Sequence, residues 1–172
     1  MQRRVFDSFA PPGVLRTWMV AAVAVAAGVP ASAAPPALNS IAPDFALKAV
    51  DGHNVRLSEY RGEPVVVHFW AGWCGPCRES VAALDALGLR SGTPVLGVNL
   101  DGADRSAAVA DSLHLKMPTL VDAQQSVARS YDVAKLPLTL LLDAEGRVRA
   151  SWSGVAADFA ELTPQLERLR QD

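Results

Sequence analysis

Cysteine is scarce in this sequence, which has only Cys74 and Cys77 among its 172 residues. Two thiolates cannot complete a zinc site without other ligands, and the three histidines are not spaced as metal ligands. The residue that follows Cys77 is Arg78 and not histidine, so the attachment signature of a c-type haem is absent. We therefore expect no resident metal and no cofactor.

The sequence also lacks an excess of charge of either sign. It has 16 basic and 18 acidic residues, which give a formal net charge of −2 at pH 7. A nearly neutral chain gives no indication of a nucleic-acid partner. No internal repeat is present and no feature indicates assembly, so we expect a monomer.

A long apolar run is missing as well. Residues 18–29 are mostly Ala and Val, but they fall short of the roughly 20 apolar residues that a membrane-spanning helix needs. Arg3 and Arg4 precede this run, and Ala31-Ser32-Ala33 follows it with small residues at the spacing of a cleavage site. Residues 1–33 are predicted to be a secretory signal peptide, with an uncleaved membrane anchor as the alternative. An Ala/Pro-rich linker at 34–40 and one domain at 41–172 would follow.

The two cysteines lie in the segment Trp73-Cys74-Gly75-Pro76-Cys77. Residues 63–70 before it are predicted to form a buried strand and residues 78–89 after it a helix, in whose first turn Pro76 is tolerated. Cys74 would then lie at the helix N-terminus, where backbone N–H groups and the helix dipole favour a thiolate by about 0.3–2 kcal/mol. This lowers the pKa of a thiol by up to about one unit.

The spacing of the pair also bears on its role. A structural disulfide stabilises most when it closes a long loop, and this one would enclose only two residues. We therefore expect a reactive pair, because the thiolate is the nucleophile in disulfide exchange.

The remaining pattern predicts an α/β fold with a mixed sheet and helices on both faces. The helix after the second buried strand is expected to begin with Asp101 or Asp104 as its cap. The predicted elements are a hairpin at 44–48 and 55–57, strands at 93–100, 117–121, 138–142 and 147–152, and helices at 104–115, 126–131 and 158–170.

Several short segments together form a recognisable pattern: Ala42-Pro43-Asp44-Phe45, Leu57-Ser58 and Gly62, the stretch from His68 to Arg78, Tyr131-Asp132-Val133, Leu136-Pro137-Leu138-Thr139, and Leu142-Asp143-Ala144-Glu145-Gly146. With this pattern, residues 41–170 resemble exported thioredoxin-like proteins of the TlpA/ResA kind. The resemblance implies a thioredoxin fold with an N-terminal β-hairpin extension and a thiol–disulfide oxidoreductase activity.

The same resemblance implies roles for individual residues. Cys74 would be the attacking nucleophile and Cys77 the resolving thiol. The Leu136–Pro137 peptide bond would be cis and would face the dithiol, leaving the Leu136 backbone free to pair with an extended substrate segment. The residues expected to support the pair or to form the docking surface are Trp73, Gly75, Pro76, Leu136 and Pro137.

The sequence departs from the family pattern near the site. Relatives commonly carry a glutamate three residues after the second cysteine and a proline two residues beyond it, and here these positions are Ser80 and Ala82. Glu79 is one position early and should point about 100° away around the helix. Lys135 and Leu138 replace the glycine and threonine that are usual around the cis proline. These changes bear on the proton chemistry and on the substrate surface.

His68 holds the position at which thioredoxins have a buried acid, six residues before the first cysteine. Cys77 is expected to be the more buried thiol, and it must lose a proton to resolve a mixed disulfide although burial raises its pKa. One hypothesis is that His68 accepts this proton, directly or through a water. The alternative is a neutral core histidine that is hydrogen-bonded to a backbone carbonyl.

We expect a reductase of protein disulfides in the periplasm, because Gly75-Pro76 matches reducing thioredoxins. The resemblance implies a membrane electron donor of the DsbD/CcdA type and substrates such as apocytochrome c. An oxidant or isomerase of exported proteins is the main alternative. A peroxidase is less favoured because no threonine motif accompanies a single peroxidatic cysteine, and so is a metal carrier.

Overall fold

The computed structural model describes residues 36–154 and 159–171. The predicted signal peptide or anchor, residues 1–33, lies outside the described residues. Within the described ranges, no helix has the length and apolar character needed to cross a bilayer. Pairing starts at Asn39, whose N–H donates to the carbonyl of Val148, and continues at Ser40, whose carbonyl accepts from the N–H of Val148.

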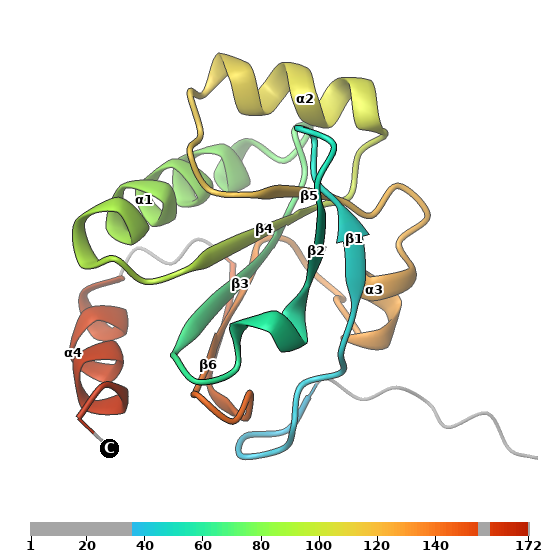
Figure 1. Ribbon diagram of the computed structural model, residues 1–172. Coiled ribbons are helices and arrows are strands. Elements are labelled where there is room, and N and C mark those ends of the chain that lie inside the picture. Colours follow the sequence, from blue (N-terminus) through green and yellow to red (C-terminus); the bar gives the residue numbers. More distant parts are fainter. Residues whose placement is uncertain (1–35, 155–158, 172) are drawn as a thin grey trace, which may run out of the picture. The chain divides into compact units, whose positions relative to one another are not determined.

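A five-stranded mixed sheet forms the centre of the domain, in the order β5-β4-β3-β6-β7 (Figure 1). Strands β3 and β4 and strands β4 and β5 run parallel, whereas β6 is antiparallel to both β3 and β7. Every residue of β3, β4 and β6 is buried, as expected for strands covered on both faces. The strands are β3 (Val65–Trp70), β4 (Val95–Asn99), β5 (Thr119–Val121), β6 (Leu138–Leu142) and β7 (Val148–Ser153).

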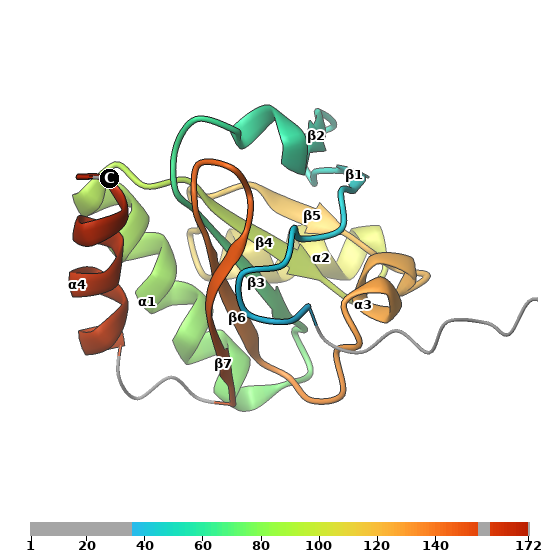
Figure 2. The ribbon, with the colours of Figure 1, turned by 90° about the horizontal axis from the view of Figure 1, so that it is seen from below.

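Helices α1 (Gly75–Ser91) and α4 (Phe159–Leu169) cover one face of this sheet, and α3 (Ser126–Ser130) covers the other (Figures 1 and 2). Helix α2 (Ala103–Ser112) joins the parallel strands β4 and β5 and packs near α1. The fold class predicted from the sequence is confirmed.

Side chains alternate between the two faces along β3, and this alternation places the site. Val66 packs with residues of α1 and α4, and Trp70 packs with both cysteines. Phe69 belongs to the core on the α3 side. His68 has the same parity as Val66 and Trp70, so its side chain points toward α1.

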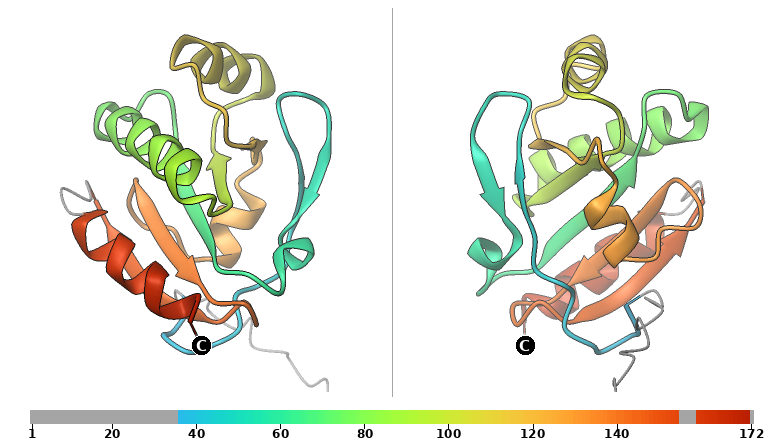
Figure 3. Two further views of the ribbon diagram at one scale, coloured as in Figure 1. Left: turned by 60° about the vertical axis from the view of Figure 1, so that its left-hand side comes forward. Right: turned by 90° about the vertical axis from the view of Figure 1, so that its right-hand side faces the viewer.

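The N-terminal hairpin lies against the α3 side of the sheet, opposite α1 and α4 (Figure 3). It consists of β1 (Ala46–Lys48) and β2 (Asn54–Arg56), followed by the 3₁₀ turn η1 (Leu57–Tyr60). The hydroxyl of Tyr131 donates to the carbonyl of Pro43 at 2.6 Å, and burial raises the pKa of Tyr131. This bond ties the hairpin segment to the end of α3.

Two helix starts differ from the sequence-based expectation. Helix α1 begins at Gly75, three residues earlier than expected, with Cys74 itself as the N-cap. Neither Asp101 nor Asp104 caps α2: the N-cap is Gly102, which offers no side-chain acceptor. The cap prediction was wrong because the Asp101 carboxylate bonds elsewhere, as described below.

Candidate active site

The two cysteines form a disulfide at the N-terminus of α1. The S–S distance is 2.05 Å and the Cα–Cα distance is 5.2 Å. Sγ of Cys74 also accepts the backbone N–H of Cys77 at 3.3 Å. Pro76 lies in the first turn, where its missing N–H is not needed. The predicted position of Cys74 at a helix N-terminus is confirmed.

Exposure differs sharply across the site. Cys77 is fully buried, whereas Cys74 retains 8% of its accessible surface. Trp73, directly before it, is 65% exposed, and Trp70 is fully buried beneath. The side of the pair that faces solvent is therefore that of Cys74 and Trp73, whereas Cys77 has no accessible surface.

The Leu136–Pro137 peptide bond is cis, as the family resemblance implied. Leu136 packs against the cluster that contains both cysteines and Trp70, so this segment lies beside the dithiol. Pro137 is buried, and its carbonyl accepts the N–H of Gly154 at 2.8 Å.

An open groove lies between the first turns of α1 and the end of α2. Glu79 is exposed there, as its helical position predicted, and so is Arg78. Lys135 is exposed at the cis-proline segment. The groove is lined by Gly75, Arg78, Glu79, Ala82 and Leu113.

His68 is fully buried and hydrogen-bonds to two hydroxyl groups. Its Nδ1 lies 2.9 Å from Oγ1 of Thr139, and its Nε2 lies 3.2 Å from Oγ of Ser80. The Ser80 hydroxyl donates its single proton to the carbonyl of Cys77 at 3.0 Å. In this arrangement Nε2 is therefore the donor to Ser80, and Nδ1 accepts from Thr139.

Burial lowers the pKa of His68 to about 3, so the imidazole is neutral at physiological pH. The alternative prediction, that His68 is hydrogen-bonded to a backbone carbonyl, is wrong, because both ring nitrogens face hydroxyl groups. His68 is linked to Cys77 through one intervening side chain.

Sequence reasoning missed Thr139 as a partner of His68. The two residues are directly opposite in the antiparallel register of β3 and β6, although 71 positions separate them in the chain. Ser80 was noted only as a departure from the family pattern. Its spacing of three from Cys77 along a helix was a signal that the two residues share a face.

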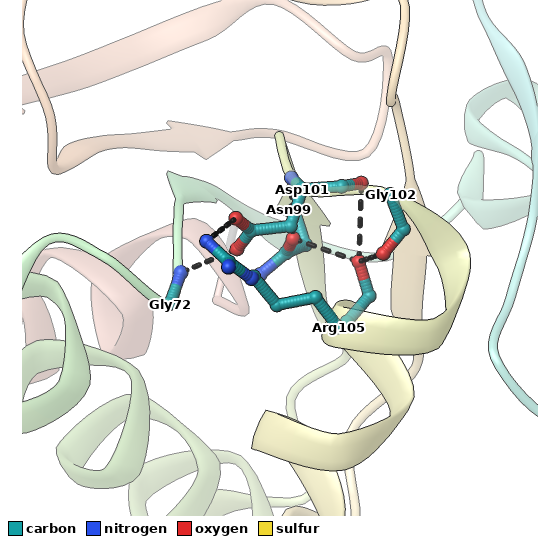
Figure 4. Close-up of polar contacts among 6 residues, drawn as sticks. Gly72, Asn99, Asp101, Gly102 and Arg105 are labelled. Carbon is teal, nitrogen blue, oxygen red and sulfur yellow. Dashed lines mark hydrogen bonds and ion pairs between the residues drawn. The ribbon is translucent and has the colours of Figure 1, made fainter.

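Asp101 contacts the loop before Cys74 (Figure 4). Its Oδ2 accepts the backbone N–H of Gly72 at 2.6 Å, and its Oδ1 lies 3.8 Å from the guanidinium of Arg105. The side chain of Asn99 accepts the backbone N–H of Asp101 at 2.8 Å and the hydroxyl of Ser106 at the same distance. Sequence reasoning assigned Asp101 no role beyond a helix cap.

The two remaining histidines lie at the surface. His53 and His114 are both exposed. In the portion of the chain that the structure covers, no three His, Cys, Asp or Glu side chains gather as metal ligands would.

Residues 38–151 match the model of the AhpC/TSA family, which covers well over half of the chain. The chain belongs to this family. It is 36% identical over 122 residues to the thiol–disulfide oxidoreductase ResA of Geobacillus kaustophilus, an alignment that spans 69% of this chain and 70% of ResA. It is 34% identical over 114 residues to the thioredoxin-like protein YneN of Bacillus subtilis, with 63% of this chain and 66% of YneN aligned.

A solved structure gives the same result. The protein of Chlorobium tepidum assigned as thiol:disulfide interchange protein DsbE superimposes with a TM-score of 0.70 at 31% identity, over 77% of this chain and 97% of its own. Together with the disulfide at the head of α1, these relatives identify a thioredoxin-like thiol–disulfide oxidoreductase.

Proposed function

We propose that this oxidoreductase works outside the cytoplasm and reduces disulfides of partner proteins through Cys74 and Cys77. The observation that carries the proposal is the asymmetry of the pair: Cys74 keeps 8% of its accessible surface beside the exposed Trp73, whereas Cys77 is fully buried. Such an arrangement suits one thiol that meets the partner and a second thiol that reacts only with the first.

The reaction takes place in two exchanges. The Cys74 thiolate attacks one sulfur of the partner disulfide, whose S–S bond breaks, and the released partner thiolate takes up a proton. Cys77 then loses its proton and attacks Sγ of Cys74, which releases the second partner thiol. The partner gains two electrons and two protons, and the pair ends as the Cys74–Cys77 disulfide.

His68 is proposed as the acceptor of the Cys77 proton, with Ser80 between the two. The contacts that support this role are the Nε2–Oγ distance of 3.2 Å and the bond from Ser80 to the Cys77 carbonyl. The pKa of about 3 keeps His68 neutral beside the disulfide. To accept a proton through Ser80 the ring must adopt the tautomer that carries its proton on Nδ1, in which Nδ1 donates to Thr139 and Nε2 accepts from the Ser80 hydroxyl. A thiolate that forms at Cys77 places negative charge near the ring and favours its protonation.

Docking is proposed to involve Trp73, Leu136 and Pro137, with Gly75 and Pro76 shaping the turn between the thiols. The exposed indole of Trp73 and the groove along α1 support a surface for an extended partner segment. Aromatic side chains of this kind contribute strongly to protein interfaces.

The location and the electron supply are further parts of the proposal. The basic, apolar and small-residue pattern of residues 1–33 supports export to the periplasm, either as a free domain or on an uncleaved anchor. A reductase there needs a membrane donor, proposed to be of the DsbD/CcdA type. The family resemblance favours apocytochrome c as a substrate, within cytochrome c maturation.

A redox titration in thiol/disulfide buffers, followed by the fluorescence of Trp70 and Trp73, tests the direction. A midpoint at or below about −270 mV, the value of thioredoxin, is expected for a reductase. A midpoint near about −120 mV, as in DsbA, would make the protein an oxidant and overturn the proposed direction. Consumption of hydrogen peroxide would favour the peroxidase alternative, and metal retained after dialysis would favour a carrier.

A further inference from the structure

The loop that joins β3 to Cys74 is held from the side by one carboxylate. Asp101 follows β4 and is 6% exposed, and its Oδ2 accepts the N–H of Gly72 at 2.6 Å (Figure 4). A hydrogen bond to a charged acceptor at this distance is among the stronger kinds in proteins. This hydrogen bond connects two residues that lie 29 positions apart in the chain, and one of them, Gly72, is two residues before the nucleophile Cys74.

The Asp101 carboxylate is itself fixed in place. Asn99 Oδ1 holds its backbone N–H at 2.8 Å, and the N–H of Leu100 donates to the carbonyl of Trp70 at 3.0 Å. Arg105, one turn into α2, provides the positive charge nearest to the carboxylate at 3.8 Å. Hydrogen bonds and one ion pair therefore connect the ends of β3 and β4 and the start of α2 around the acceptor.

Gly72 is matched to this contact. A Cβ at this position would lie 2.8 Å from Cγ2 of Val109 and 3.1 Å from Oδ2 of Asp101. The first distance is too short for two carbon atoms, so any larger residue would push the loop away from α2 and the carboxylate. The absence of a side chain allows the Gly72 N–H to reach Asp101.

We infer that Asp101 is a positioning residue of the redox site, acting through the Gly72 peptide to keep Cys74 at the N-terminus of α1. This inference rests on the thiol chemistry proposed above. In the N-cap position, Sγ of Cys74 receives the N–H of Cys77 at 3.3 Å, the same donor that would stabilise a thiolate in the reduced protein. A loop released from Asp101 lets Cys74 move off this donor, and its thiolate loses stabilisation.

The test compares two substitutions at one position. Asp101→Asn keeps an oxygen acceptor for Gly72 and removes the charge, whereas Asp101→Ala removes both. The charge effect is common to the two variants, so the ratio of their Cys74 reactivities reports the hydrogen bond alone. Asp104→Asn, which removes an exposed carboxylate from the first turn of α2, three residues after Asp101, is the matched control.

The measurement is the rate of alkylation of the reduced full-length protein by iodoacetamide between pH 5 and 9. We expect Asp101→Ala to react about tenfold more slowly than Asp101→Asn below the thiol pKa, which corresponds to a pKa raised by about one unit. The control should react at the wild-type rate. Equal rates for Asp101→Ala and Asp101→Asn would overturn the inference.

A second variant covers the case in which Asp101→Ala does not fold. Gly72→Ala leaves the carboxylate in place and separates it from the loop, and it should also slow alkylation about tenfold. A wild-type rate for Gly72→Ala would contradict the positioning role. Alkylation needs no partner protein, so these outcomes are independent of whether the protein proves to be a reductase or an oxidant.

Discussion

The imidazole of His68 and the hydroxyl of Ser80 form a buried hydrogen bond, with Nε2 and Oγ 3.2 Å apart. Ser80 occupies the position at which TlpA/ResA-like proteins commonly carry glutamate, and His68 lies six residues before Cys74. The residue that replaces the family's usual glutamate is therefore in contact with the residue that stands where thioredoxins have a buried acid. Together they place a titratable ring, rather than a carboxylate, next to the backbone of Cys77.

The buried His68 should make stability depend on pH. Its pKa is about 3 in the folded protein and about 6.5 in the unfolded chain, so between these values only the unfolded chain binds the proton. The free energy of unfolding should therefore fall by about 1.4 kcal/mol for each pH unit between 6.5 and 3 on account of this group. Denaturant unfolding of wild type and His68→Asn at several pH values measures it.

The informative quantity is the difference between wild type and His68→Asn in how the free energy of unfolding changes with pH. His68→Asn should lose this component of the pH dependence, whereas the exposed control His114→Asn should keep it. Parallel curves for wild type and His68→Asn would show that His68 does not titrate on unfolding.

The link between Ser80 and His68 should govern the second exchange and not the first. Ser80→Ala and His68→Asn are both expected to slow release of the mixed disulfide by about a hundredfold near pH 7, at the low end of general-base contributions. Attack by Cys74 should change little. Stopped-flow fluorescence with a disulfide-bonded partner separates the two phases.

A serine elsewhere on α1 provides the control. Ser91→Ala, at the far end of the helix, should leave both phases unchanged. If the release rates of Ser80→Ala and His68→Asn stay at the wild-type value from pH 5 to 9, neither residue handles the proton.

Loss of Cys77 should stop the reaction at the mixed disulfide between Cys74 and the partner. Cys77→Ser removes the buried resolving thiol, so the Cys74–partner disulfide is expected to accumulate. Cys74→Ser should form no such adduct, because its remaining thiol is fully buried. Non-reducing electrophoresis and mass spectrometry of the adduct distinguish the two variants, and an adduct through Cys77 would reverse the proposed order of attack.

Trp73 should contribute to partner binding and little to folding. Its side chain is 65% exposed, so Trp73→Ala should leave the midpoint of thermal unfolding nearly unchanged. An interface aromatic lost on truncation costs more than about 1 kcal/mol, so KM for a protein disulfide should rise about fivefold or more. Leu89→Ala, which alters a side chain that is 66% exposed at the other end of α1, should leave KM at the wild-type value.

The sequence by itself determined the local chemistry of the site. A buried apolar strand, a turn with Pro76 and a following helix place Cys74 at a helix N-terminus whatever surrounds them, because these preferences act between near neighbours in the chain. Alternation along β3 likewise directs His68 to the α1 side. The mixed α/β class followed from the order of strand and helix patterns.

The tertiary structure alone decided which distant groups meet these residues. The register of β6 against β3 sets Thr139 opposite His68, and a shift of one residue would turn the hydroxyl to the other face. Local reasoning assigned Asp101 to the start of α2, because an acidic residue before a helix usually caps it. The folded chain instead brings the Gly72 N–H within 2.6 Å of its carboxylate, a contact set by strand packing that sequence neighbours cannot encode.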